Sequence, residues 1–301
     1  MKNEEAILEK HQERRKEIRE FLQAKYGNKI HSPFDSGSYA KHTAINTKFD
    51  LDLVVPFKRN SFPALREMYD DVFKELREEY KKLAVVREQK VSIGLEFYGD
   101  TDGQKVNIDV VPGRELNQDQ YLADKKLNLY VRKTYGQFEE GAERLRTNIH
   151  AQIDNIRKRA EAAADIRKVI RLLKVWKVRN NGNIKSFLIE LITIKAFDSK
   201  DMTGNIWDKL QAVLEFIRDN IETITLVDPG NGGNNVSETL SDFDKKSIRE
   251  TMGYILDRIG DNEENITYYF PINEKFPCNE EKGKYGIKEA GLSIPPATKF
   301  G

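Results

Sequence analysis

The chain has 301 residues, of which 33% are charged, and its 50 Lys and Arg residues nearly balance its 49 Asp and Glu residues. A formal net charge of +1 argues against a protein whose main role is to grip long nucleic acid, because that role requires many uncompensated cations. A chain of this length can form one large domain or two smaller lobes with separate cores.

The cysteine, histidine and apolar patterns exclude further classes of protein. Cys278 is the single cysteine, and the four histidines do not have the spacing of zinc ligands, so neither an intrachain disulfide nor a zinc site is expected. No apolar run approaches the roughly 20 residues that cross a bilayer, and the charged first residues do not resemble a signal peptide. We therefore expect a cytoplasmic monomer without a membrane partner.

The first half of the chain predicts a mixture of helices and strands, with glycine and proline at their ends. Pro56 should end its strand or lie at a sheet edge, because proline cannot donate a hydrogen bond to a neighbouring strand. The expected elements are a helix over 3–26, a loop with a short helix over 29–45, a strand over 49–56, a helix from about 61 to 83, and strands within 84–98 and over 105–111.

Two aspartates stand two residues apart in the first of these strands. Side chains alternate between the faces of a strand, so Asp50 and Asp52 share one face while Phe49, Leu51 and Leu53 face a core. Neighbouring carboxylates repel each other, and a divalent cation is the usual way to neutralise them.

A third acid, Asp109, occurs in the strand over 105–111, on the face opposite Val106, Ile108 and Val110. If this strand pairs with the first, Asp109 joins the other two aspartates. Three carboxylates suit two Mg²⁺ ions, or Mn²⁺ as the alternative, and two ions about 3.5–4 Å apart can stabilise both oxygens of an in-line phosphoryl transfer. The competing interpretation is that the three acids are solvated at the strand ends.

The second half of the chain predicts helices almost throughout. Ile166, Val169, Ile170, Leu173 and Trp176 have the spacing of an amphipathic helix. The expected helices cover 165–178, 184–196, 206–223 and 242–259, with a Gly- and Asn-rich turn over 228–235 before the last. The whole pattern predicts an α+β protein in which a catalytic lobe over 1–140, with a long N-terminal helix and a small mixed sheet, joins a helical lobe over 141–301 that ends in an irregular tail.

Gly37 and Ser38 precede the two-aspartate strand, with Ser38 twelve residues before Asp50. A glycine allows the backbone to approach a phosphate closely, and a serine hydroxyl can hold that phosphate. Gly37-Ser38, then Asp50-Leu51-Asp52, then Asp109 resembles the signature of the polymerase-β-like nucleotidyltransferases. That resemblance implies their fold, with an active-site cleft between the two lobes.

The second half extends the resemblance. The segments 167–177 and 184–190 resemble the helical lobe of the cGAS/DncV-like nucleotidyltransferases, the bacterial relatives of cyclic GMP-AMP synthase and oligoadenylate synthase. The resemblance implies that Lys174 and Ser186 grip the donor triphosphate and that Phe187 stands where animal relatives place a base-stacking tyrosine. Structural roles remain open for all three: a lysine that extends from a core helix, a serine bonded to its own backbone, and a core phenylalanine.

The family resemblance implies an enzyme that joins ribonucleoside triphosphates, ATP and GTP among them, into a cyclic dinucleotide or short cyclic oligonucleotide. This product would be a second messenger for antiphage defence, sensed by an effector protein. The implied residues are Asp50, Asp52 and Asp109 for catalysis and metal binding, and Gly37, Ser38, Lys174, Ser186 and Phe187 for nucleotide binding. The alternatives are transfer to another acceptor, such as tRNA, a protein or an aminoglycoside, and an inactive nucleotide-binding protein, which the presence of all three acids disfavours.

Overall fold

The computed structural model describes residues 2–45, 51–99, 105–132 and 144–271, and the chain divides into two compact units. The first unit contains Met1–Asn155 with Pro229–Asn231, and the second contains Ile156–Asp228 with Gly232–Gly301. The predicted lobe boundary at residue 140 lies outside the described residues.

The first unit is built on a mixed sheet. Its elements are α1 (Lys2–Tyr26), a 3₁₀ turn (Gly27–Lys29), β1 (Phe34–Ser36), α2 (Gly37–Ala40), β2 (Leu51–Phe57), α3 (Leu65–Tyr80), β3 (Ala84–Glu88), β4 (Ile93–Phe97), β5 (Val106–Glu115), α4 (Tyr121–Asp124), β6 (Leu127–Tyr130), β7 (Arg144–Thr147) and α5 (Ile149–Arg157). The described strands form one seven-stranded sheet in the order β1-β2-β5-β4-β3, and β6 and β7 extend it from β5. Only the β2–β5 pair among them is parallel.

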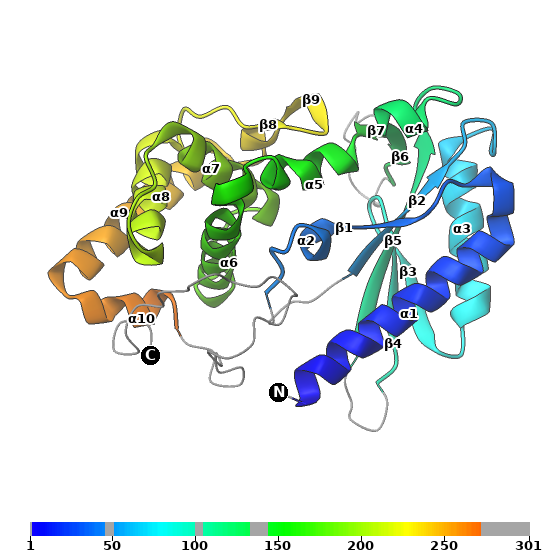
Figure 1. Ribbon diagram of the computed structural model, residues 1–301, viewed down its shortest axis with the longest axis horizontal. Coiled ribbons are helices and arrows are strands. Elements are labelled where there is room, and N and C mark those ends of the chain that lie inside the picture. Colours follow the sequence, from blue (N-terminus) through cyan, green and yellow to red (C-terminus); the bar gives the residue numbers. More distant parts are fainter. Residues whose placement is uncertain (1, 46–50, 100–104, 133–143, 272–301) are drawn as a thin grey trace. The chain divides into compact units, whose positions relative to one another are not determined.

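Helices α1 and α3 both run along this sheet (Figure 1) and share its main core. Helix α1 contributes Ile18 and Leu22, one turn apart, and α3 contributes Met68, Val72 and Leu76 at helical spacing, all fully buried. Alternate apolar residues of β2, β4 and β5 complete the core. Burial of each such side chain stabilises the fold by about 1.5–3 kcal/mol. The helices therefore cover the face of the sheet on which the alternating apolar residues of the strands lie.

The opposite face of the sheet carries a second, smaller core. Val54 of β2 and Val111 of β5 pack there with Leu129 of β6 and with Ile149 and Ile153 of α5. The short elements α4, β6 and β7 that form or flank this cluster were not predicted, whereas α5 lies in the part of the chain predicted to be helical almost throughout. The buried Ile149, Ile153 and Ile156 of α5 have helical spacing.

The second unit is mainly helical. Its elements are a 3₁₀ turn (Ala160–Ala162), α6 (Ala163–Arg179), α7 (Ser186–Ser199), α8 (Ile206–Asn220), β8 (Val227–Asp228), β9 (Asn231–Asn235, shared with the first unit), a 3₁₀ turn (Val236–Thr239), α9 (Asp242–Asp261), a 3₁₀ turn (Glu263–Asn265) and α10 (Ile266–Tyr269). The four long helices enclose one core, and the predicted apolar stripe of α6 is buried in the unit. Capping boxes begin two of these helices, Asn205 with Asp208 at α8 and Ser241 with Asp244 at α9.

Two features of the predicted strands were wrong. Strand β2 continues past Pro56 to Phe57 and lies between β1 and β5 rather than at an edge. The proline carbonyl still accepts a hydrogen bond from the His31 amide at 2.8 Å, and Ile30 bridges Phe57, so the missing donor does not end the strand. The expectation of helices almost throughout the second half was also wrong at β7 and at the β8–β9 pair.

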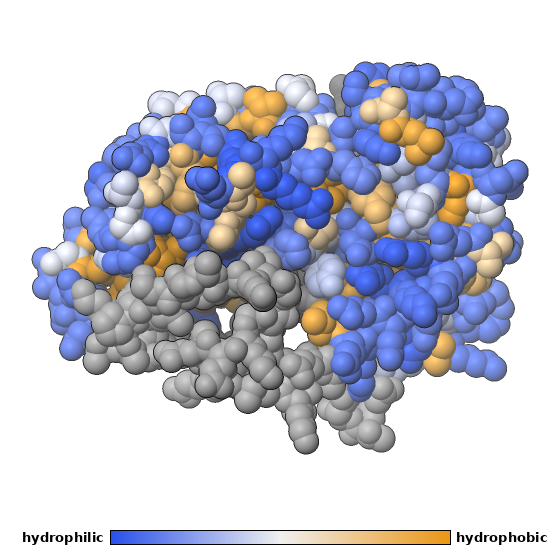
Figure 2. Space-filling model, viewed as in Figure 1, coloured by the Kyte–Doolittle hydropathy of each residue, from blue (hydrophilic) through white to orange (hydrophobic). Residues whose placement is uncertain are grey.

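The surface is polar, as the high fraction of charged residues leads one to expect. Most of the described surface visible in Figure 2 is hydrophilic, and apolar residues lie on it in scattered groups. No helix in the described part of the chain has both the length and the apolar character needed to span a bilayer.

Candidate active site

Four residues on neighbouring strands form a row across the sheet of the first unit. Ser36 of β1 is paired with Asp52 of β2, Asp52 with Asp109 of β5, and Asp109 with Gly94 of β4. Paired residues share a face, and neighbouring strands lie about 4.8 Å apart, so the two aspartates project side by side. This face is opposite the main core, as the alternation of apolar residues predicts, and both aspartates are half-buried.

The third predicted acid, Asp50, lies outside the described residues. Within the described ranges, no group of three or more His, Cys, Asp and Glu side chains comes together as a metal site. The three-carboxylate cluster therefore stays a prediction. Asp52 and Asp109 are described, and their half-buried carboxylates occupy directly paired positions. These two carboxylates fit a hard divalent cation, because such a cation prefers oxygen ligands and would relieve the repulsion between the like charges.

Gly37 lies directly against the Asp52 carboxylate. A Cβ atom at position 37 would stand 1.7 Å from Oδ2 and 2.6 Å from Cγ of Asp52, so any side chain there would displace the carboxylate or the turn. Gly37 also has a φ of +62°, in the left-handed region that favours glycine. Ser38 follows it in α2, half-buried, and its carbonyl accepts a hydrogen bond from the Thr43 amide at 2.9 Å. The predicted glycine–serine turn is thus placed beside Asp52.

Helix α1 holds this turn on both sides. Arg15 Nη1 lies 2.8 Å from Asp35 Oδ2, and Arg19 Nη2 lies 3.0 Å from Asp35 Oδ1. After the turn, Gln12 Nε2 donates a hydrogen bond to the Tyr39 hydroxyl at 3.2 Å. These α1 side chains were not predicted to contact the turn, because their partners are distant in the sequence.

The loop between β3 and β4 reaches the other aspartate. Gln89 Nε2 donates to Asp109 Oδ1 at 3.0 Å, and Ser92 Oγ donates to Gln89 Oε1 at 2.6 Å. The buried Tyr69 hydroxyl donates to the carbonyl of Ser92 at 2.7 Å. Burial raises the pKa of Tyr69 to about 12, so the phenol keeps its proton at neutral pH. This network was not predicted from the sequence. The one signal that could have indicated it is Gly94, a glycine inside a strand.

In the second unit, Lys174 is part of a buried ion pair. Its Nζ lies 2.8 Å from Oε1 of Glu190, and each residue is only 5% exposed. The pair joins α6 to α7. The predicted role of Lys174 in gripping a triphosphate stays a prediction. The competing role, a lysine that extends from a core helix to solvent, does not describe this contact, because the ammonium is buried against Glu190.

A different lysine lies beside the predicted serine. Lys177 Nζ is 3.3 Å from Ser186 Oγ, and Ser186 is the first residue of α7. Lys177 follows Lys174 by about one helical turn, a spacing that could have suggested it as a second candidate. Phe187 is half-buried and packs against the helical core, which uses part of its apolar surface.

Known proteins resemble the chain in sequence, although no family model matches it. It is 30% identical over 191 residues to the cyclic AMP-AMP-AMP synthase of Escherichia coli strain MS 115-1, covering 60% of this chain. This similarity agrees with the resemblance to the cGAS/DncV-like nucleotidyltransferases. A second relative, the CBASS oligonucleotide cyclase CdnC of E. coli strain KTE188, is 24% identical over 240 residues, which are 71% of each protein. The chain spans about half of the first of these relatives, 55% of its length.

A solved structure of one such cyclase has the same fold. The structure of CdnC from E. coli MS115-1 with ATP superposes with a TM-score of 0.66 at 22% identity, covering 88% of this chain and 87% of CdnC. The predicted fold, a polymerase-β-like lobe with a mixed sheet and a second, helical lobe, is confirmed.

The Lys174–Glu190 pair gives a stability prediction. Replacing Lys174 with methionine should lower the free energy of unfolding by about 3–5 kcal/mol, because the Glu190 carboxylate stays buried without its ammonium partner. Thermal melting followed by circular dichroism measures the effect. The double variant Lys174→Met/Glu190→Leu should regain most of the lost melting temperature, because it removes both charges.

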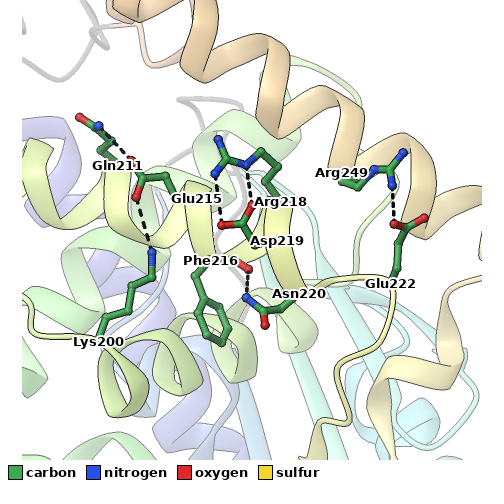
Figure 3. Close-up of polar contacts among 9 residues, drawn as sticks. All are labelled: Lys200, Gln211, Glu215, Phe216, Arg218, Asp219, Asn220, Glu222 and Arg249. Carbon is green, nitrogen blue, oxygen red and sulfur yellow. Dashed lines mark hydrogen bonds and ion pairs between the residues drawn. The ribbon is translucent and has the colours of Figure 1, made fainter.

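An exposed pair in the same unit serves as control. Arg249 on α9 faces Glu222 (Figure 3), and both side chains are 41% exposed. Arg249→Gln should change stability by no more than about 1 kcal/mol, because exposed pairs are screened by water. If Lys174→Met melts at the temperature of the native chain, the pair is not structural, and the role of Lys174 in holding a nucleotide becomes the better interpretation.

Proposed function

We propose that the chain is a nucleotidyltransferase that joins ribonucleoside triphosphates into a cyclic oligonucleotide messenger for antiphage defence. The observation that carries this proposal is the paired Asp52 and Asp109 with Gly37 packed against the Asp52 carboxylate. Sequence similarity to a cyclic AMP-AMP-AMP synthase supports it. ATP is the first substrate to test, since that synthase joins AMP units and CdnC was solved with ATP.

We assign Asp50, Asp52 and Asp109 as ligands of two Mg²⁺ ions. When bound, the ions would make the attacking ribose hydroxyl more acidic and stabilise the pyrophosphate that leaves. Asp109 accepts the proton of that hydroxyl as a general base. The ribose oxygen forms a bond to the α-phosphorus while the bond from that phosphorus to pyrophosphate breaks. A second transfer, in which the linear product supplies the triphosphate, closes the ring.

Two pairs of residues, one pair in each unit, are proposed to bind nucleotide phosphates. Gly37 leaves the backbone accessible, and the Ser38 hydroxyl donates to a phosphate oxygen. Lys177 and Ser186 lie 3.3 Å apart, close enough to bind one phosphate group together. Lys177 therefore joins Lys174 as a candidate for the lysine that the family resemblance implies.

Lys177→Ala should raise the KM for ATP by about 10–100-fold, since a hydrogen bond to a charged group contributes about 1.5–3 kcal/mol. The melting temperature should change little, because the half-buried Lys177 is not part of the Lys174–Glu190 pair. Steady-state kinetics at saturating Mg²⁺ provide the measurement. Lys185→Ala is the matched control: Lys185 is an exposed lysine directly before Ser186, and its removal should leave KM unchanged. An unchanged KM in Lys177→Ala would remove this residue from the proposed site.

The activity itself can be tested without any added acceptor. The purified chain is incubated with the four ribonucleoside triphosphates and Mg²⁺, treated with phosphatase, and analysed by mass spectrometry. A phosphatase-resistant product with one phosphate per nucleoside supports a cyclic oligonucleotide. Consumption of triphosphate only after addition of tRNA, protein or aminoglycoside would instead favour transfer to another acceptor, the alternative that the shared catalytic lobe leaves open.

The product-sensing effector is the second part of the proposal. A cyclic product has no terminal phosphate, so a receptor can distinguish it from the cellular pool of nucleotides. We propose that a separate effector protein binds this product and carries out the defensive response.

A further inference from the structure

We propose that Gln89 is a positioning residue that sets the orientation of the Asp109 carboxylate for the metal. The inference rests on the proposed function, because it assigns Gln89 a task toward the ions that Asp109 would bind. Gln89 belongs to the loop between β3 and β4, and its side chain reaches across to β5, where its Nε2 lies 3.0 Å from Asp109 Oδ1.

The orientation of the Gln89 amide follows from its contact with Asp109. An ionised carboxylate only accepts hydrogen bonds, so the NH₂ end of the amide points at Asp109 and donates to it. The carbonyl end then accepts a hydrogen bond from Ser92 Oγ at 2.6 Å. Both ends of the amide therefore have a partner.

The loop that carries Gln89 is itself anchored to α3. The hydroxyl of Tyr69 lies 2.7 Å from the Ser92 carbonyl and 3.0 Å from the Gln89 carbonyl, and it accepts a hydrogen bond from the Gln89 amide at 3.1 Å. Tyr69 is fully buried in the main core. A continuous set of contacts therefore runs from the core of the first unit to the Asp109 carboxylate.

Gly94 leaves the space that this arrangement needs. A Cβ atom at position 94 would stand 2.4 Å from Gln89 Nε2 and 3.2 Å from Asp109 Oδ1. Gly94 is the second residue of β4, where glycine weakens a strand, and its φ is not in the left-handed region. Backbone conformation thus gives no reason for a glycine here, whereas the approach of the Gln89 amide does.

The consequence concerns metal affinity. Residues that hydrogen-bond to metal ligands hold those ligands in the orientation that binds the ion, and their loss typically weakens metal binding by about 10–100-fold. A purely structural tie between the loop and β5 would instead affect the melting temperature and leave metal binding unchanged. The two roles therefore predict different measurements.

The test measures Mn²⁺ binding to the full chain by electron paramagnetic resonance, without nucleotide or turnover. Gln89→Leu removes the donor at similar volume and should weaken Mn²⁺ binding by about 10–100-fold. Gly94→Ala should act in the same direction, because its methyl group would displace the Gln89 amide. Gln118→Leu is the matched control, since exposed Gln118 donates the same kind of bond to Asp119 at 2.9 Å and its loss should not alter binding.

Asp109→Asn separates this inference from the function on which it rests. If Asp109→Asn binds Mn²⁺ as tightly as the native chain, the metal site of the proposed function is wrong. If Asp109→Asn loses affinity while Gln89→Leu and Gly94→Ala keep it, only the role of Gln89 is wrong. Should Gln89→Leu fail to fold, the affinity of folded Gly94→Ala decides the question: native affinity contradicts the proposal.

Discussion

The Asp52→Asn variant should make product at least about a thousandfold more slowly than the native chain. Asparagine keeps the size of the side chain but removes the charge that would hold a divalent ion, and such an ion contributes several kcal/mol of transition-state stabilisation. Asp109→Asn should lose at least as much activity, because it also removes the proposed base. Formation of labelled product from ATP and Mg²⁺ measures both effects.

The Asp52→Asn and Asp109→Asn variants should keep the stability of the native chain. Both aspartates are half-buried and lie side by side, so removal of one charge relieves repulsion, and the melting temperature should not fall. Asp70→Asn provides the control for a general effect of the substitution, because Asp70 is exposed on α3 and pairs with Arg66. A folded Asp52→Asn variant with native activity would contradict the assignment of this site.

The Gly37→Ala variant is expected to have the second-largest effect, with nearly complete loss of activity. The new methyl carbon would stand 1.7 Å from Asp52 Oδ2, so the carboxylate or the turn must move. A non-glycine residue in the left-handed region also costs about 1–2 kcal/mol. The contact with Asp52 affects the site, whereas the left-handed backbone of a non-glycine residue affects stability. A second variant can separate these two effects.

Gly27→Ala separates them. Gly27 has a φ of +48°, but a Cβ there would meet nothing within 4 Å. Both alanine variants should therefore melt at a lower temperature, while only Gly37→Ala should lose activity. Equal loss of activity in the two variants would show that stability, rather than contact with Asp52, explains the requirement for glycine.

The buried faces of single strands and helices were predicted correctly, because the apolar pattern of each segment indicates them. The alternation in β2 and β5 places Leu51, Leu53, Ile108 and Val110 in the main core, and it therefore places Asp52 on the opposite face. The helical spacing in α6 likewise predicted the buried side chains of that helix. These predictions succeed because burial depends on the backbone period, which a local segment displays.

The contacts that complete the site depend on partners distant in the sequence. Gln89 lies in a loop without periodic signal, and only the pairing of β4 with β5 brings it to Asp109. Lys177 and Lys174 are close on one helix, and the sequence does not indicate that Glu190 pairs with Lys174 while Ser186 lies beside Lys177. Tertiary packing decides such choices between similar side chains.

The central claim is that Asp52 and Asp109 hold a divalent ion together. A crystal of the chain grown with Mn²⁺ and a non-hydrolysable ATP analogue tests it, because anomalous scattering locates manganese without assumptions about the protein. The account predicts a manganese peak coordinated by carboxylate oxygens of both aspartates, with a phosphate oxygen of the nucleotide also bound. Nucleotide bound in the crystal with no manganese at either aspartate would contradict it.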